Sequence, residues 1–93
     1  MLPEVTAFEL APVWVCEVLS PSTVPLDRTR KLPIYARERV QHVWLVDPSL
    51  GTLEVLRLDG GGYRILGAWH GDAIVHAEPF DVYALHLADL WSA

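Results

Sequence analysis

The chain has 93 residues, of which 52% are hydrophobic and 20% are charged. This length supports a single domain over residues 1–93, because chains divide into two cores only well above this size, and the composition excludes a disordered tail. The formal net charge of −5 and an isoelectric point near 5.1 exclude a protein that coats nucleic acid through a generally basic surface.

Features that the sequence lacks indicate where the protein is located and which cysteine chemistry it can have. No apolar run approaches the roughly 20 residues of a membrane span. The first ten residues, MLPEVTAFEL, lack the basic region and the long apolar stretch of a signal peptide. Cys16 is the sole cysteine, so the chain cannot form an internal disulfide or a cysteine metal cluster. We therefore expect a cytoplasmic protein with no membrane partner.

The N-terminal part of the chain predicts a lead-in followed by a strand. Residues 1–10 have mixed polarity and contain Pro3, which indicates a loose lead-in. Residues 13–19 are rich in strand formers and apolar on both alternating faces, the pattern of a central strand covered on both sides. The Ser-Pro-Ser-Thr run at 20–23 ends this strand, because proline cannot donate to a ladder and serine and threonine favour turns.

A helix is predicted next, over residues 26–39, where Leu32, Tyr35, Ala36 and Val40 recur at helical spacing. Pro33 either kinks this helix or marks the first turn of a shorter helix that starts near Lys31.

Three further strands are predicted over residues 42–48, 52–58 and 63–69, and a short fifth over 74–75. The imperfect alternation of residues 52–58 is typical of a strand on the edge side of a sheet. The Gly-Gly-Gly run at 60–62 predicts a tight hairpin, and residues 85–91 predict a closing short helix. The resulting fold class is α+β (α/β-like), with a mixed β-sheet built on the order β-α-β-β-β.

Charge is distributed unevenly along the chain. Residues 27–39 hold five of the seven basic residues against two acidic ones, a local charge of +3. The five are Arg28, Arg30, Lys31, Arg37 and Arg39. This segment leaves open a local approach of nucleic acid, although the whole chain is acidic.

Glu17 is the first candidate functional residue. It lies in an otherwise apolar strand, on the face that it shares with Val13, Val15 and Leu19. An ionised carboxylate there is costly unless it is paired, hydrogen-bonded or bound to a metal. The alternative is a purely structural glutamate bonded to a backbone amide or an arginine.

Two other groups of residues are weaker candidates. Asp27, Lys31 and Tyr35 have the spacing i, i+4 and i+8 and would share one face of an unbroken helix. Lys31 could there stabilise a phosphate or a water-derived nucleophile, although by itself the spacing favours a surface ion pair worth well under about 1 kcal/mol. Asp47 closes a strand before Pro48, where most such residues cap a turn and a minority bind metal. The four histidines have no zinc-ligand spacing.

These residues fall within a longer pattern, formed by A-P-V-W-V-C-E-V-L-S-P-S-T at 11–23, then Asp27, Lys31 and Tyr35, and V-W-L-V-D-P at 43–48. The pattern resembles the Uma-two family, small bacterial proteins of the PD-(D/E)XK superfamily of restriction endonucleases. The match covers roughly residues 10–91, and E-V-L-S-P-S-T is its most specific part.

The resemblance implies a site and a cofactor. In that superfamily two acids from neighbouring strands hold Mg²⁺ or Mn²⁺, and a lysine positions or activates the attacking water. By position, Glu17 would be the second metal-binding acid. Leu19 occupies the motif's lysine position, so the resemblance assigns the catalytic lysine to Lys31 on the following helix. Asp27 and Tyr35 would be supporting residues on the same face.

The chain also departs from the family pattern. Val13 stands where the pattern has aspartate, and the first acid, normally on a strand well upstream, has no counterpart. We expect a chain without the family's N-terminal half, whose uncovered sheet edge pairs with another copy in a homo-oligomer.

Two function hypotheses follow from these observations. The first is a metal-dependent endonuclease domain that hydrolyses nucleic-acid phosphodiesters, with DNA as partner, degenerate or incomplete in this chain. The second is a non-catalytic remnant that acts as a dimerisation or protein-interaction module.

Overall fold

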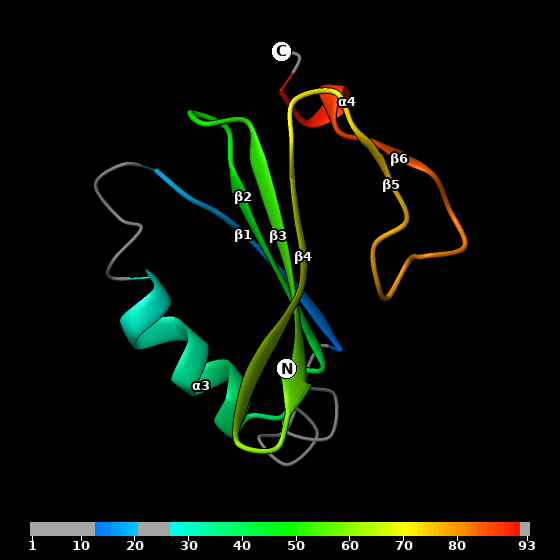
Figure 1. Ribbon diagram of the computed structural model, residues 1–93. Coiled ribbons are helices and arrows are strands. Elements are labelled where there is room, and N and C mark those ends of the chain that lie inside the picture. The colour runs from blue at the N-terminus through cyan, green and yellow to red at the C-terminus, as the bar shows by residue number, and fades with distance from the viewer. Residues whose placement is uncertain (1–12, 21–26, 92–93) are drawn as a thin grey trace, which may run out of the picture.

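The structure, a computed structural model, describes residues 13–20 and 27–91 (Figure 1). In chain order the elements are β1 (Trp14–Val18), the π-helical turn η1 (Asp27–Lys31), α3 (Leu32–Arg37), β2 (His42–Asp47), β3 (Thr52–Asp59), β4 (Gly62–His70), β5 (Ile74–Val75), β6 (Leu85–His86) and α4 (Ala88–Trp91). None of the helices in these two ranges is long and apolar enough to cross a membrane.

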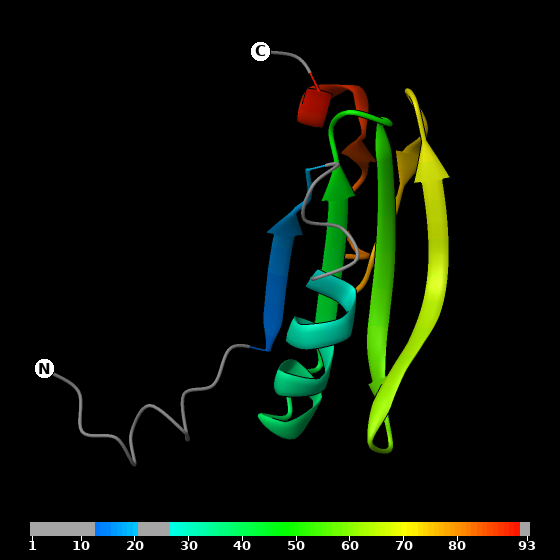
Figure 2. The same cartoon turned by 90° about the vertical axis from the view of Figure 1, so that its left-hand side faces the viewer.

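A four-stranded mixed sheet in the order β1-β2-β3-β4 forms the centre of the fold. Strand β1 runs parallel to β2, and the pairs β2–β3 and β3–β4 are antiparallel. A parallel pair needs a crossover connection, and η1 and α3 lie on that connection, against one face of the sheet (Figure 2). The predicted α+β class with a mixed sheet is confirmed.

The predicted positions of two strands were wrong. Strand β1 lies at one end of the sheet and not in its centre, and Val18 is 67% exposed. Strand β3, expected on the edge side, lies between β2 and β4, with Leu53 and Val55 fully buried. An apolar strand sequence predicts that the strand is buried. Its position in the middle or at the edge of the sheet depends on pairing with strands far along the chain.

The helix follows the second of the two alternatives that Pro33 left open. Lys31 is the N-cap of α3, and Pro33 lies in the first turn, where its missing N–H costs nothing. The hairpin between β3 and β4 turns at Gly60, whose φ of 66° is a left-handed conformation that glycine adopts without strain. The hairpin was expected from the sequence, whereas the two alternatives for Pro33 were left open there and the π-helical turn η1 before α3 was not predicted.

The C-terminal segment packs on the face opposite α3. Strands β5 and β6 form a separate two-stranded sheet, so the predicted fifth strand exists but does not extend the main sheet. The predicted helix over 85–91 is confirmed only for Ala88–Trp91, because Leu85 and His86 pair with β5 instead. Val75, Ala77 and Leu87 of this segment are buried against Trp44 and Leu53 of the sheet.

Each face of the sheet therefore has its own apolar core. The core under the C-terminal segment includes Trp44, Val46, Leu53 and Val55. The core under α3 consists of Leu19, Val40, Val43, Leu45 and Leu56, with Val15 and Tyr35 packed against it. Alternate residues of β1 and β2 face the two cores, as the period-two geometry of strands requires.

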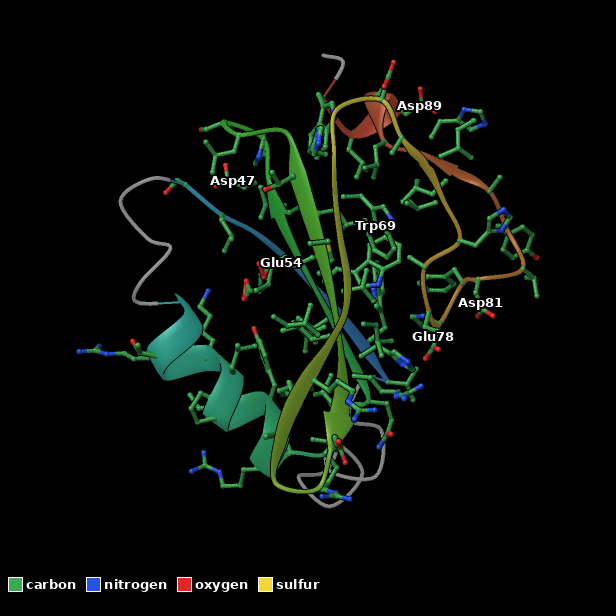
Figure 3. The ribbon with its side chains drawn as sticks, in the orientation of Figure 1. Asp47, Glu54, Trp69, Glu78, Asp81 and Asp89 are labelled. Carbon is green, nitrogen blue, oxygen red and sulfur yellow. The ribbon has the colours of Figure 1, made fainter. Side chains whose placement is uncertain are left out.

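Glu78 fastens the C-terminal segment to the sheet. Its carboxylate lies 2.9 Å from Nε2 of His42 and 3.3 Å from the guanidinium of Arg57, and its backbone carbonyl accepts a hydrogen bond of 2.8 Å from the indole of Trp44. Figure 3 shows Glu78 on the side of the sheet opposite α3. The hydrogen bond from His42 and the charge of Arg57 hold the pKa of Glu78 below its usual range.

We predict that Glu78→Gln destabilises the fold at neutral pH but not in acid. The lowered pKa means that the folded state favours the ionised carboxyl, so its contribution is complete above the unfolded pKa of about 4.3 and is lost as the pH falls through the folded value. Chemical denaturation at about pH 7 and about pH 3 measures the difference, which should shrink in acid. Asp72→Asn, at an exposed turn, is the matched control. An equal loss of stability at both pH values would contradict the prediction.

Candidate functional site

Glu17 lies in the middle of the site, on β1 and under α3. The register pairs Glu17 with Leu45 of β2, so its side chain shares the face of the α3 core. The side chain is 16% exposed. A carboxylate at that depth needs partners, because water no longer solvates all of it.

Lys31 and Tyr35 supply those partners from one side of the helical segment. The ammonium group of Lys31 lies 3.3 Å from Oε1 and 3.1 Å from Oε2 of Glu17. The hydroxyl of Tyr35 donates a hydrogen bond of 2.6 Å to Oε2. The spacing of four residues puts both side chains on the same side of the turn, and they meet a residue that is 14 and 18 positions away in the chain.

The positive charge of this cluster lies closer to solvent than its negative charge. The side chain of Lys31 is 47% exposed, so a positive charge lies at the solvent side and the carboxylate lies beneath it. A solute anion approaching from solvent would therefore meet the ammonium group of Lys31 first.

Cys16 is the neighbour of Glu17 on the strand. Desolvation and the neighbouring carboxylate raise the pKa of the Cys16 thiol.

The structure also gives the positions of three other residues that the sequence analysis considered. The backbone of Asp27 begins η1, and its side chain lies outside the part of the chain that the structure describes. Leu19 is 6% exposed and belongs to the α3 core, where it has no polar group to offer. Asp47 is buried and accepts a hydrogen bond of 3.1 Å from the amide of Leu50, which is the turn-capping role.

Glu54 was missed by the sequence reasoning. The register aligns Glu17, Leu45 and Glu54 in one row across three strands, so the two glutamates lie on the same face and flank Leu45. Figure 3 shows Glu54 on the α3 side of the sheet. Two strand spacings, about 10 Å, separate their backbones. The interrupted alternation of residues 52–58 was the available signal, but it was interpreted as a mark of an edge strand.

One chain offers a divalent cation few ligands. Among residues 13–20 and 27–91 no group of three or more His, Cys, Asp or Glu side chains could hold a metal ion. Both oxygens of Glu17 already contact Lys31 or Tyr35. Mg²⁺ demands near-octahedral oxygen coordination, and this donor set does not supply it. The described residues of a single chain thus do not fit the metal site that the family resemblance implies.

The sequence matches a known protein family. Residues 3–88 match a family model described as "Uma2: Putative restriction endonuclease". The chain belongs to the Uma2 family. This match covers nearly the whole chain and confirms the Uma-two resemblance carried by the E-V-L-S-P-S-T segment.

A solved structure supports the same fold for this Uma2 chain. It is a crystal structure from Anabaena variabilis described as a putative nuclease belonging to DUF820, with 28% identity and a TM-score of 0.65. The match covers 87% of this chain but 44% of the other chain, so this Uma2 chain spans less than half the length of that protein. No protein of curated function matches the sequence.

We predict that Tyr35→Phe lowers the free energy of unfolding of this Uma2 chain by about 1.5–3 kcal/mol, the value of a hydrogen bond to a charged group. The cause is the removal of the 2.6 Å bond to the half-buried Glu17 carboxylate. Urea denaturation at neutral pH measures the change. The control is Tyr83→Phe, which removes the hydroxyl of a residue that is 70% exposed and should have no measurable effect. Equal effects of the two substitutions would mean that the Tyr35–Glu17 bond contributes nothing.

Proposed function

We propose that this chain is a nucleic-acid-binding domain of the nuclease lineage that carries an incomplete site for phosphodiester hydrolysis. The observation that carries the proposal is the convergence of Glu17, Lys31 and Tyr35 on one face of the sheet. The Uma2 family membership supports a nuclease lineage for a site of this composition. Within this proposal the chain acts in the cytoplasm, where its exposed Cys16 stays a free thiol.

The roles of the three residues follow from their contacts. Lys31, half exposed above Glu17, is placed to neutralise a phosphate oxygen that approaches from solvent. Tyr35 holds the carboxylate of Glu17 in one orientation by its hydrogen bond. Hydrolysis would form a bond between a water oxygen and phosphorus and break the bond to the leaving sugar oxygen, which takes a proton.

The partner that we propose is DNA, bound along the basic segment that includes α3. Arg30 and Arg37 are exposed and lie on the same helical segment as Lys31. Phosphate contacts made by such residues orient a duplex without reading its sequence. The acidic remainder of the chain confines this binding to one surface.

We expect Arg30→Glu to weaken DNA binding and to reduce the slope of log K against log salt concentration by about 1 for each phosphate that the protein no longer neutralises. Fluorescence anisotropy with a short labelled duplex over a range of salt concentrations measures both quantities. Arg64→Glu is the matched control, because Arg64 is 63% exposed on β4 and shares the face of its ladder partner Arg57, which binds Glu78 on the side opposite α3. If both variants bind DNA equally well, the helical segment is not the binding surface.

A second candidate function is a non-catalytic dimerisation or interaction module. It is favoured by one observation: the Glu17 carboxylate is already neutralised by Lys31 and bonded by Tyr35, so it can serve the fold alone. The two candidates differ in whether the carboxylate also takes part in binding a cation.

Calorimetric titration with Mn²⁺ and Mg²⁺ separates these candidates. The first requires cation ligands beyond the described residues of one chain, and its signs would be binding by the wild type, a rise in melting temperature through mass action, and loss of both in Glu17→Gln. Glu38→Gln, a change of the same type at the end of α3, is the control and should bind normally. Absence of binding at millimolar metal would reject the hydrolytic site and leave the interaction module.

A further inference from the structure

The outward side of α3 carries an apolar side chain where a polar one is the rule. Leu32 and Tyr35 pack against the α3 core and Ala36 is buried, so these three residues mark the side of the helix that faces the sheet. Successive residues of an α-helix are rotated by about 100°, which puts Ile34 close to the opposite side. Ile34 is 44% exposed there. A surface helix usually has polar residues at such positions, so the packing of the core does not account for this isoleucine.

Two arginines flank Ile34 on the same outward side. Arg30 precedes it by four residues and Arg37 follows it by three, the spacings that put side chains on one side of a helix. Both arginines are exposed. Arg30, Ile34 and Arg37 therefore form an outward stripe, in which one apolar group lies between two positive charges. Figure 1 and Figure 2 show no described element outside α3, so this stripe faces solvent.

The other exposed positions near the stripe have roles of their own. Pro33 lies in the first turn of α3, where proline favours the start of a helix. Lys31 turns toward β1 and contacts Glu17. Ile34 has no comparable role within the helix. A ligand on the outward stripe would also lie beside the cluster of Glu17 and Lys31.

We propose that Ile34 contacts the 5-methyl group of a thymine in the major groove of DNA, with Arg30 and Arg37 on the flanking phosphates. This inference rests on the proposed function and names the feature of the bases that the DNA-binding surface reads. The major groove, about 12 Å wide, admits an α-helix, and the thymine methyl is an apolar group on its floor. Seven residues separate the two arginines, about 10 Å along a helix, so the contact covers about three base steps of 3.4 Å.

The composition of the stripe favours DNA over a protein partner. A stable protein interface has a broad apolar core from which charged residues are depleted, whereas the outward stripe has one isoleucine and two charges. Arginine contacts to phosphates set the position of a duplex, and a contact with a base edge adds preference for a sequence. Arg30 and Arg37 thus supply the position, and Ile34 supplies the preference.

Exchange of thymine for uracil tests the contact directly. It removes the methyl group from the major groove and leaves the phosphates and the hydrogen-bonding groups of the bases in place. Fluorescence anisotropy compares the full chain on two labelled duplexes of one sequence, one with thymine and one with uracil. The thymine duplex should bind about three- to fourfold more tightly, the value of burying one methyl-sized group.

The two ways to fail are distinguishable. Equal affinities for the two duplexes, with binding still weakened by Arg30→Glu, would overturn the thymine contact and leave α3 as a DNA-binding surface. Absence of binding to both duplexes would overturn the proposed function and the thymine contact together. This comparison uses the wild type, so it is decisive even where a variant does not fold.

A matched pair of variants assigns the preference to one residue. Ile34→Ala should bind both duplexes with the affinity that the wild type has for the uracil duplex. Its slope of log K against log salt concentration should not change, because no phosphate contact is lost. Ile65→Ala makes the same change at a residue that is 58% exposed on β4, and it should keep the wild-type preference. A preference for thymine that survives in Ile34→Ala would overturn the assignment.

Sedimentation equilibrium without DNA tests the protein partner that Ile34 would otherwise contact, a second copy of the chain. The wild type and Ile34→Ala should have the same mass. An oligomeric wild type and a monomeric Ile34→Ala variant would overturn the proposal, because they would make Ile34 a residue of a protein interface.

Discussion

The half-buried carboxylate of Glu17 constrains the arrangement of the elements around it. An acid on an apolar strand face is tolerated only where partners replace the water that it loses. Here the partners are Lys31, the N-cap of α3, and Tyr35, in the middle of α3. These contacts fix α3 against the parallel pair β1–β2, and the apolar residues of the α3 core then pack around them. The contacts of Glu17 and the apolar packing of α3 therefore depend on each other.

The two faces of the sheet are held by different chemistry. Under α3, the core residues lie beside the ion pair of Glu17 and Lys31. On the other face, the aromatic rings of Trp14, Trp44 and Phe80 meet edge to face, with centroids 5.0–5.8 Å apart, and Glu78 secures the same segment through His42 and Arg57. The attachment of the C-terminal segment therefore depends on the ionisation of Glu78, whereas α3 is held by a separate set of contacts.

Local patterns in the sequence were enough to predict the helix and to place Lys31 and Tyr35 on one side of it. Pro33 sets where α3 begins, and the four-residue spacing puts Lys31 and Tyr35 on one side of it. Their approach to Glu17 required only that the crossover pack on β1, which a parallel β-α-β unit makes necessary. The family resemblance identified the same residues independently of the packing argument.

Local patterns could not predict which strands pair or which residues meet across long separations in the chain. Whether β1 or β3 is central depends on which strands pair, and the apolar character of residues 13–19 does not contain that information. Glu54 joins the row of Glu17 only through the register of β3 on β2. Glu78 meets His42 and Arg57 across separations of 36 and 21 residues, which no short window of sequence reports.

The alternation of β1 separates the chemistry of the site from the chemistry of the edge. Glu17 turns its backbone groups toward β2 and its side chain toward α3, so both are committed within the chain. Cys16 and Val18 turn their backbone groups outward and their side chains to the other face. The pairing that positions Glu17 and the outward edge of β1 thus use different residues of the same strand.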